Sequence, residues 1–426
     1  MSELFKNNKA FRLLLAYQFF SSLGGGIFSL FMLLSVHLIY QNPIYTGIAG
    51  FLMALPFIFA FAVGPIVDRR NKVTIMWLTT LLEFGVLAML VFIPFQEWFG
   101  VVFMFTVIFI YALAALFESP SSSALLPQIV PEDKIMEANS LIRIVTLVGG
   151  IVIAILLITT LDENTNVAFI YGISAGFLAF AFLFALLLKD PNASIVKKST
   201  LYYGDFDTKQ KQSTSHNYKD DLRAGGHFVR QSVLFYLTIA FVAKVFVIEV
   251  ASISMPMFAE YHVGAQGYII LAVMGMLGGI SASFLTGIFG KKFKVGQLLL
   301  IMFALAGIAR IAFANILPAH LSGGLVILVF YAAMGNATSI IFQSLGQSIP
   351  PKEMVGRVDT IATTVSAIFV TIGALVGGFL GSIVPVVDHI FIYQGISYVV
   401  IGVLVFLVPS VRILPKMSEI EKHKNE

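Results

Sequence analysis

Four ionisable side chains lie deep inside apolar stretches of this 426-residue chain: Glu83, Lys244, Glu249 and Arg310. A charge in a hydrocarbon environment is expensive, so each should be neutralised, paired or exposed to water. Because desolvation favours the neutral form of a carboxyl or an ammonium group, such a group can act as a proton carrier. The sequence therefore predicts these residues as candidates for proton coupling or for a polar cavity. The alternative is a buried ion-pair network with a structural role only.

The spacing of Lys244 and Glu249 along the chain indicates whether they can pair with each other. Lys244 and Glu249 are five positions apart in one stretch, which places them roughly 140° apart around a helix. They cannot form an i, i+4 pair, so we expect them to face different partners. Arg310 lies toward the far half of its stretch, where it could snorkel to the surface or pair with an acid.

Uncharged polar side chains recur at helical spacing in two further stretches. Gln18, Ser21 and Ser22 fall on one helical face by i, i+3, i+4 spacing. Such small polar residues line a cavity or let helices pack closely, and both interpretations stay open. A second polar face lies near residues 336–343. The cavity-lining candidates are Gln18, Ser22, Asn336, Ser339 and Gln343.

A charged turn, GPIVDRRNK, separates two apolar stretches between Gly64 and Lys72. Gly64 would let two helices approach closely, and Asp68 could dock at a helix N-terminus. Arg69 and Lys72 would hold the turn in the cytoplasm. We therefore predict a gating hairpin formed by Gly64, Asp68, Arg69 and Lys72. The alternative is a basic turn that only fixes topology.

The elements that must position these residues are membrane spans. The chain is 58% hydrophobic and 12% charged, with a mean hydropathy of +0.91, whereas soluble domains carry about twice that charge. The sequence predicts an all-α integral membrane protein with twelve transmembrane helices, each near the length that a bilayer needs. The predicted spans are 11–40, 45–67, 73–94, 100–119, 141–160, 167–188, 233–257, 267–290, 295–315, 323–345, 360–384 and 389–411.

The Lys and Arg residues orient these spans. If both termini face the cytoplasm, all of the 27 Lys and Arg residues except Lys244 and Arg310 fall on cytoplasmic segments or span ends. This satisfies the positive-inside rule. It predicts cytoplasmic termini. We also expect helix-end contacts on the cytoplasmic side from Glu118, Arg143 and Arg357, with Glu118 capping a helix or pairing with the basic gate loops. Residues 125–134 would form a short helix there.

The chain repeats itself weakly. Pro131 matches Pro350 and Gly64 matches Gly287, and the number of residues between the two members is nearly the same in both pairs. Internal duplication is typical of transporters. We predict a six-helix bundle in residues 1–188, a polar cytoplasmic linker in 189–232, and a second, pseudo-symmetric six-helix bundle with a cytoplasmic tail in 233–426.

The hairpin, the twelve spans and the repeated halves resemble the major facilitator superfamily. Residues 126–139 and 347–358 are similar to its branch of macrolide efflux proteins and the enterobactin exporter. The resemblance implies a monomeric transporter in a bacterial inner membrane. It would export a drug-like compound by alternating access, driven by the proton gradient, with Asp68, Arg69 and Lys72 latching the inner face. A siderophore exporter or a nutrient importer stays open, as does a non-transporting receptor or scaffold.

Other functions lack sequence support. The chain has no cysteine, no phosphate-binding loop and no His-Glu-x-x-His motif, so we expect no enzyme activity, metal or cofactor. The basic residues of 189–232 alternate with acids, which argues against nucleic-acid binding. The expected partners are a small-molecule substrate and the lipid bilayer. The lone His37 is expected to be packed or solvated.

Overall fold

The computed structural model describes residues 8–92, 95, 97–131, 134–161, 166–189, 226–290, 292–351, 354–383, 387–416 and 419. The side chains of Pro65, Asp68, Arg69 and Met136 lie outside this description. The described residues contain helices and no strand.

Eleven helices in these ranges are long and apolar enough to cross a membrane. The first two are α2 (Lys9–Tyr40) and a segment built from α3 (Pro43–Ala54), the 3-10 turn η1 (Leu55–Phe59) and α4 (Ala60–Arg69). The others are α5 (Lys72–Leu90), α6 (Trp98–Ile129), α7 (Ile135–Thr160), α8 (Val167–Leu187), α12 (Leu234–Phe289), α13 (Val295–Ile316), α14 (Leu321–Ser348), α15 (Val355–Ile383) and α16 (Asp388–Leu407), with the short α17 (Pro409–Arg412) at the end.

Helix α12 contains two of the predicted spans. It has 56 residues and bends at Gly264, whose φ of 76° and ψ of 174° are not helical. Only glycine adopts this backbone conformation readily. The limbs 234–263 and 265–289 are each long enough to cross a hydrocarbon core about 30 Å thick at about 1.5 Å per residue. The prediction of a twelve-span, all-α membrane protein is confirmed.

The chain divides into two compact units, which do not follow the sequence halves strictly. Unit 1 contains Met1–Ser35 and Leu52–His216, and unit 2 contains Val36–Phe51 and Asn217–Glu426. Residues 36–51, at the end of α2 and in α3, thus pack with the second half. Most of the predicted linker, residues 190–225, lies outside the described residues, so the boundary at 189–232 stays a prediction.

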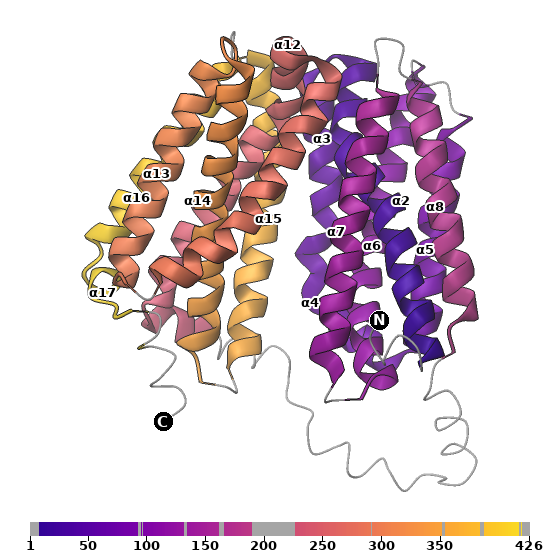
Figure 1. The fold of residues 1–426 in the computed structure, drawn as a ribbon, viewed down its shortest axis with the longest axis horizontal. Coiled ribbons are helices and arrows are strands. Elements are labelled where there is room, and N and C mark those ends of the chain that lie inside the picture. The colour runs from indigo at the N-terminus through magenta and orange to yellow at the C-terminus, as the bar shows by residue number, and fades with distance from the viewer. Residues whose placement is uncertain are drawn as a thin grey trace, which may run out of the picture. The chain divides into compact units, whose positions relative to one another are not determined.

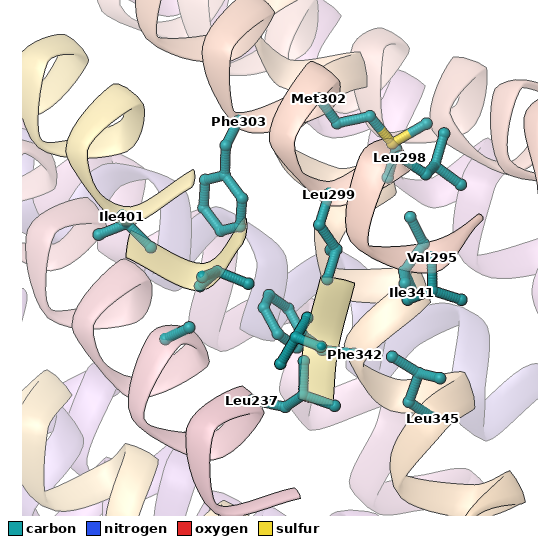
Figure 2. Close-up of a cluster of buried hydrophobic side chains, with 14 of the residues drawn as sticks. Leu237, Val295, Leu298, Leu299, Met302, Phe303, Ile341, Phe342, Leu345 and Ile401 are labelled. Atoms are coloured by element: carbon teal, nitrogen blue, oxygen red, sulfur yellow. The ribbon is translucent and has the colours of Figure 1, made fainter. Parts of the chain in front are cut away.

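In unit 1, α5 packs against α6 and α8 (Figure 1). One core cluster there joins α2, through Phe11, Leu14 and Tyr17, to Met76 of α5 and Leu125 of α6. In unit 2, α12 packs against α14 and α15, and α13 packs against α14 and α16 (Figure 1). Figure 2 shows the core of unit 2, where the following side chains meet: Leu237, Leu298, Leu299, Met302, Phe303, Ile341, Phe342, Leu345 and Ile401. Because lipid is as apolar as these side chains, close packing holds such helices together.

Helix α6 runs further than its sequence predicts. The expected span ends at residue 119, but α6 continues through Pro120 and Pro127 to Ile129. Ser121 Oγ donates to Phe117 O over 2.7 Å, and such bonds re-satisfy carbonyls in helices that contain proline. The separate helix predicted for residues 125–134 is therefore wrong, since these residues end α6 and lead into α7.

Candidate functional site

The polar centre of unit 1 is a carboxyl cluster, formed by Tyr17, Ser21, Thr80, Glu83, Tyr111 and Glu118. Glu118 of α6 accepts hydrogen bonds from two α2 hydroxyls, Tyr17 OH at 2.6 Å and Ser21 Oγ at 2.9 Å. The Tyr17 hydroxyl also lies 3.1 Å from Thr80 Oγ1 of α5. Three helices therefore meet at Glu118.

Glu83 of α5 completes the carboxyl cluster. Its side chain is 2% exposed, and it makes no hydrogen bond within the described part of the chain. It interacts electrostatically with Glu118, and both carboxyl groups interact electrostatically with Tyr17 and Tyr111. An intramembrane carboxyl without a bonded partner is the kind of group that takes up a proton.

The structure corrects the placement of Glu118. We predicted a contact at the cytoplasmic end of its helix, but α6 continues to Ile129 and Glu118 bonds to α2 instead. Arg143 is exposed on α7, and Arg357 is half-buried on α15. Tyr17 and Tyr111 were not predicted. The i, i+4 spacing of Tyr17 and Ser21 was a usable signal, because it puts both hydroxyls on one face.

Lys244 fastens α12 to α14 within unit 2. Its side chain is 1% exposed. Nζ donates to Gly335 O over 2.7 Å and also to the Ser339 hydroxyl. Ser339 therefore holds a lysine here, although we predicted that it lines a cavity. Both bonded acceptors are neutral.

Glu249 faces another helix. It is half-buried, and its Cβ lies 3.1 Å from where a Cβ on Gly373 of α15 would be. It also interacts electrostatically with Tyr268. Lys244 faces α14 and Glu249 faces α15, so the five-residue spacing correctly predicted different partners.

Arg310 of α13 lies in an aromatic cage, formed with Phe313, Tyr331, Phe391 and Gln394. Its guanidinium carbon is 4.5–4.9 Å from the three ring centroids. Nε donates to Gln394 Oε1 over 2.5 Å, and Gln394 Nε2 donates to Tyr331 OH over 3.0 Å. The expectation that Arg310 snorkels outward or pairs with an acid is wrong, because ring faces and an amide stabilise the buried cation.

The remaining cavity-lining candidates differ among themselves. Ser22 Oγ lies 2.9 Å from where a Cβ on Gly149 of α7 would be, which fits the helix-packing alternative. Gln18 is half-buried. Asn336 and Gln343 are exposed on α14, and Asn336 Nδ2 donates to Ala332 O of its own helix. A cavity-lining role for these two amides stays a prediction.

The predicted gating hairpin is mostly helix. Gly64, Asp68 and Arg69 belong to α4, and the turn occurs at Arg70 and Asn71. Asn71 Oδ1 accepts from Thr74 N over 2.8 Å and caps α5, a role that we did not predict. The half-buried Lys72 begins α5.

The proposed contacts of this hairpin stay predictions. The side chains of Asp68 and Arg69 lie outside the described residues. Gly64 is exposed, and a Cβ there would have no described atom within 4 Å. The expected close approach is therefore not made there, and α4 packs on α6 through Val63, Val67 and Leu116.

Two histidine–carboxylate pairs also escaped the sequence analysis. His37 Nε2 lies 2.6 Å from Glu260 Oε2, and His262 Nε2 lies 2.7 Å from Asp388 Oδ1. His37 is packed, as one of the two expected alternatives, and it also has a carboxylate partner. No local pattern could reveal partners that are so distant in sequence.

Comparison with known proteins identifies the family. The sequence model of the Major Facilitator Superfamily matches residues 14–370. The chain belongs to this superfamily. It is a multi-pass membrane transporter and not an enzyme, as predicted. Macrolide efflux protein A of Streptococcus pyogenes is 23% identical over 376 residues, which are 86% of this chain and 87% of the relative.

Solved transporters share the fold of this superfamily member. The nucleoside transporter NupG has a TM-score of 0.71 at 14% identity and covers 94% of this chain and 98% of its own. A POT family transporter in complex with 5-aminolevulinic acid has a TM-score of 0.68 at 15% identity, covering 94% and 96%. At these identities the likeness supports the fold alone.

Proposed function

We propose that this transporter exports a small lipophilic compound in exchange for protons, by alternating access in a bacterial cytoplasmic membrane. The observation that carries the proton coupling is Glu83, which is 2% exposed, has no hydrogen-bond partner among the described residues and lies beside a second carboxyl group. The homology to a macrolide efflux protein supports export of a drug-like compound.

The carboxyl cluster suits binding of one proton. Two ionised carboxyl groups repel each other where little water screens them, and a proton on one of them removes that repulsion. Tyr17 and Ser21 donate hydrogen bonds to Glu118, whereas Glu83 makes no hydrogen bond within the described residues. The proton therefore binds at Glu83. Because α2, α5 and α6 all contribute to the cluster, its protonation changes contacts among three helices.

The orientation of this cycle follows from the basic residues. All Lys and Arg residues outside the membrane interior fall on segments of one face, which we assign to the cytoplasm together with both termini. The transporter acts as a monomer, with the proton gradient as its energy source and no cofactor.

Efflux of a fluorescent lipophilic dye and of a macrolide from cells, with and without a protonophore, tests this function. We expect extrusion that collapses with the gradient. Glu83→Gln should abolish gradient-driven extrusion while the purified protein still binds the compound. Glu137→Gln is the matched control, because Glu137 is an exposed carboxylate on α7. Full extrusion by Glu83→Gln would overturn the proton assignment.

A further inference from the structure

The pairing of His37 with Glu260 connects α2 to α12 at the far end of α2 from the N-terminus. The His37 side chain is 7% exposed and that of Glu260 is 41% exposed, with Nε2 and Oε2 only 2.6 Å apart. The imidazole is thus held in the protein, while the carboxylate reaches solvent. Protons can reach this pair from the aqueous phase at that membrane face.

The pair holds a segment that is connected to unit 1 at both ends. Residues 36–51 pack in unit 2, whereas residues 35 and 52 belong to unit 1. Backbone contacts fasten the segment, because a Cβ on Gly47 would lie 2.7 Å from Gly378 Cα of α15. A Cβ on Gly50 would likewise lie 2.5 Å from Cδ1 of Ile253 on α12, so the glycine leaves room for that side chain. These glycine contacts involve no charged group. Of the contacts named here, the His37–Glu260 pair is the one that can change its charge.

The other ionisable groups nearby sit on the same few elements. Tyr40 of α2 packs against Tyr45 of α3, with ring centroids 5.3 Å apart. On α12, Tyr261 and His262 follow Glu260, and His262 bonds to Asp388 at the start of α16, beside His389. Asp388 already has its own imidazole partner. Glu260 is therefore the carboxylate that contacts His37.

We propose that His37 and Glu260 form a second proton-binding site, which clamps residues 36–51 onto unit 2 when the imidazole is protonated. A proton from solvent binds a ring nitrogen, and the imidazolium N–H donates to the carboxylate. When both partners are charged, ion pairing adds to the hydrogen bond that a neutral imidazole N–H can also donate to the carboxylate. Imidazole changes its charge between about pH 5 and 8, so acid strengthens the clamp and alkali weakens it. The inference rests on the proposed function only in assigning this face to the outside of the cell.

Thiol labelling tests the clamp, because the natural chain has no cysteine. Thr46 of α3 is 1% exposed, so Thr46→Cys in the full-length protein in liposomes reports release of the segment. Ser382→Cys, at an exposed position of α15, corrects for the reactivity of the thiol itself. We expect the corrected rate to be about fivefold to tenfold lower at about pH 5.5 than at about pH 8.

Variants separate the clamp from other effects of acid. His37→Gln and Glu260→Gln should each flatten the pH dependence to within about twofold. His320→Gln, which removes another histidine at a helix end, should leave it unchanged. Ala49→Cys, also buried on α3, is a second reporter should Thr46→Cys fold poorly. A pH dependence that persists in His37→Gln, or none in the parent, overturns the proposal. Labelling requires no transport, so a failed efflux assay would leave this result standing.

Discussion

The two units treat their buried ionisable groups differently. In unit 1, Glu83 has no hydrogen-bond partner among the described residues and interacts electrostatically with a second carboxyl group. In unit 2, Lys244 donates to a carbonyl and a hydroxyl, and Arg310 has an amide and three rings. A charge that neutral partners stabilise fastens helices together, whereas a carboxyl group without a bond is available to a proton. We therefore propose that coupling depends on the carboxyl cluster of unit 1, whereas Lys244 and Arg310 fasten helices together in unit 2.

The largest effect should come from Glu83→Gln, which keeps the shape of the side chain but cannot exchange a proton. We expect gradient-driven transport to fall by about 100-fold, in the range typical of lost proton-transfer groups. Transport into inverted vesicles with an imposed pH gradient measures this. Gradient-driven transport near the wild-type rate would show that Glu83 is not needed for coupling, and the proposed difference between the two units would be wrong.

Arg310→Leu should mainly affect stability. It leaves the Gln394 amide oxygen buried without its donor, which costs about 1–3 kcal/mol. A thermal unfolding scan in detergent should show a lower midpoint. The double variant Arg310→Leu with Gln394→Leu should recover at least half of the loss, since both partners are then apolar. If the double variant is no more stable than Arg310→Leu, the cage has another role.

The Tyr17→Phe variant tests the hydrogen bond between Tyr17 and Glu118 in the carboxyl cluster. It removes the 2.6 Å bond to Glu118 and keeps the ring. A hydrogen bond to a charged group contributes about 1.5–3 kcal/mol, so we expect roughly a tenfold loss of proton-driven transport with substrate binding unchanged. The matched control is Tyr236→Phe, at an exposed tyrosine of α12. Equal losses in both variants would show a nonspecific effect.

The smallest effect should follow Lys244→Met. Replacing a buried cation by an apolar side chain of similar length is often nearly neutral for stability, and Ser339 keeps its hydroxyl. We expect transport within about threefold of the wild type and an unchanged dependence on pH. Loss of proton coupling in this variant would move a coupling role into unit 2.

Local patterns predicted the spans well and the partners poorly. Hydropathy located α13 and α16 closely because a window of high mean hydropathy dominates each of them. The prolines of α6 signalled a break, but the helix continues through both of them. Arg310 was recognised as important from its charge, yet its cage depends on Phe313, Tyr331 and Phe391, which look like ordinary apolar residues in the sequence.

By itself, the sequence determined that this chain spans a membrane twelve times and which of its intramembrane residues are ionisable. Both follow from the cost of exposing polar groups to hydrocarbon, which acts on each segment independently. Only the tertiary structure decided that Glu118 binds Tyr17 and Ser21, that Arg310 is caged and that His37 pairs with Glu260. Such contacts join residues far apart in the chain, so they depend on how helices pack and not on any local spacing.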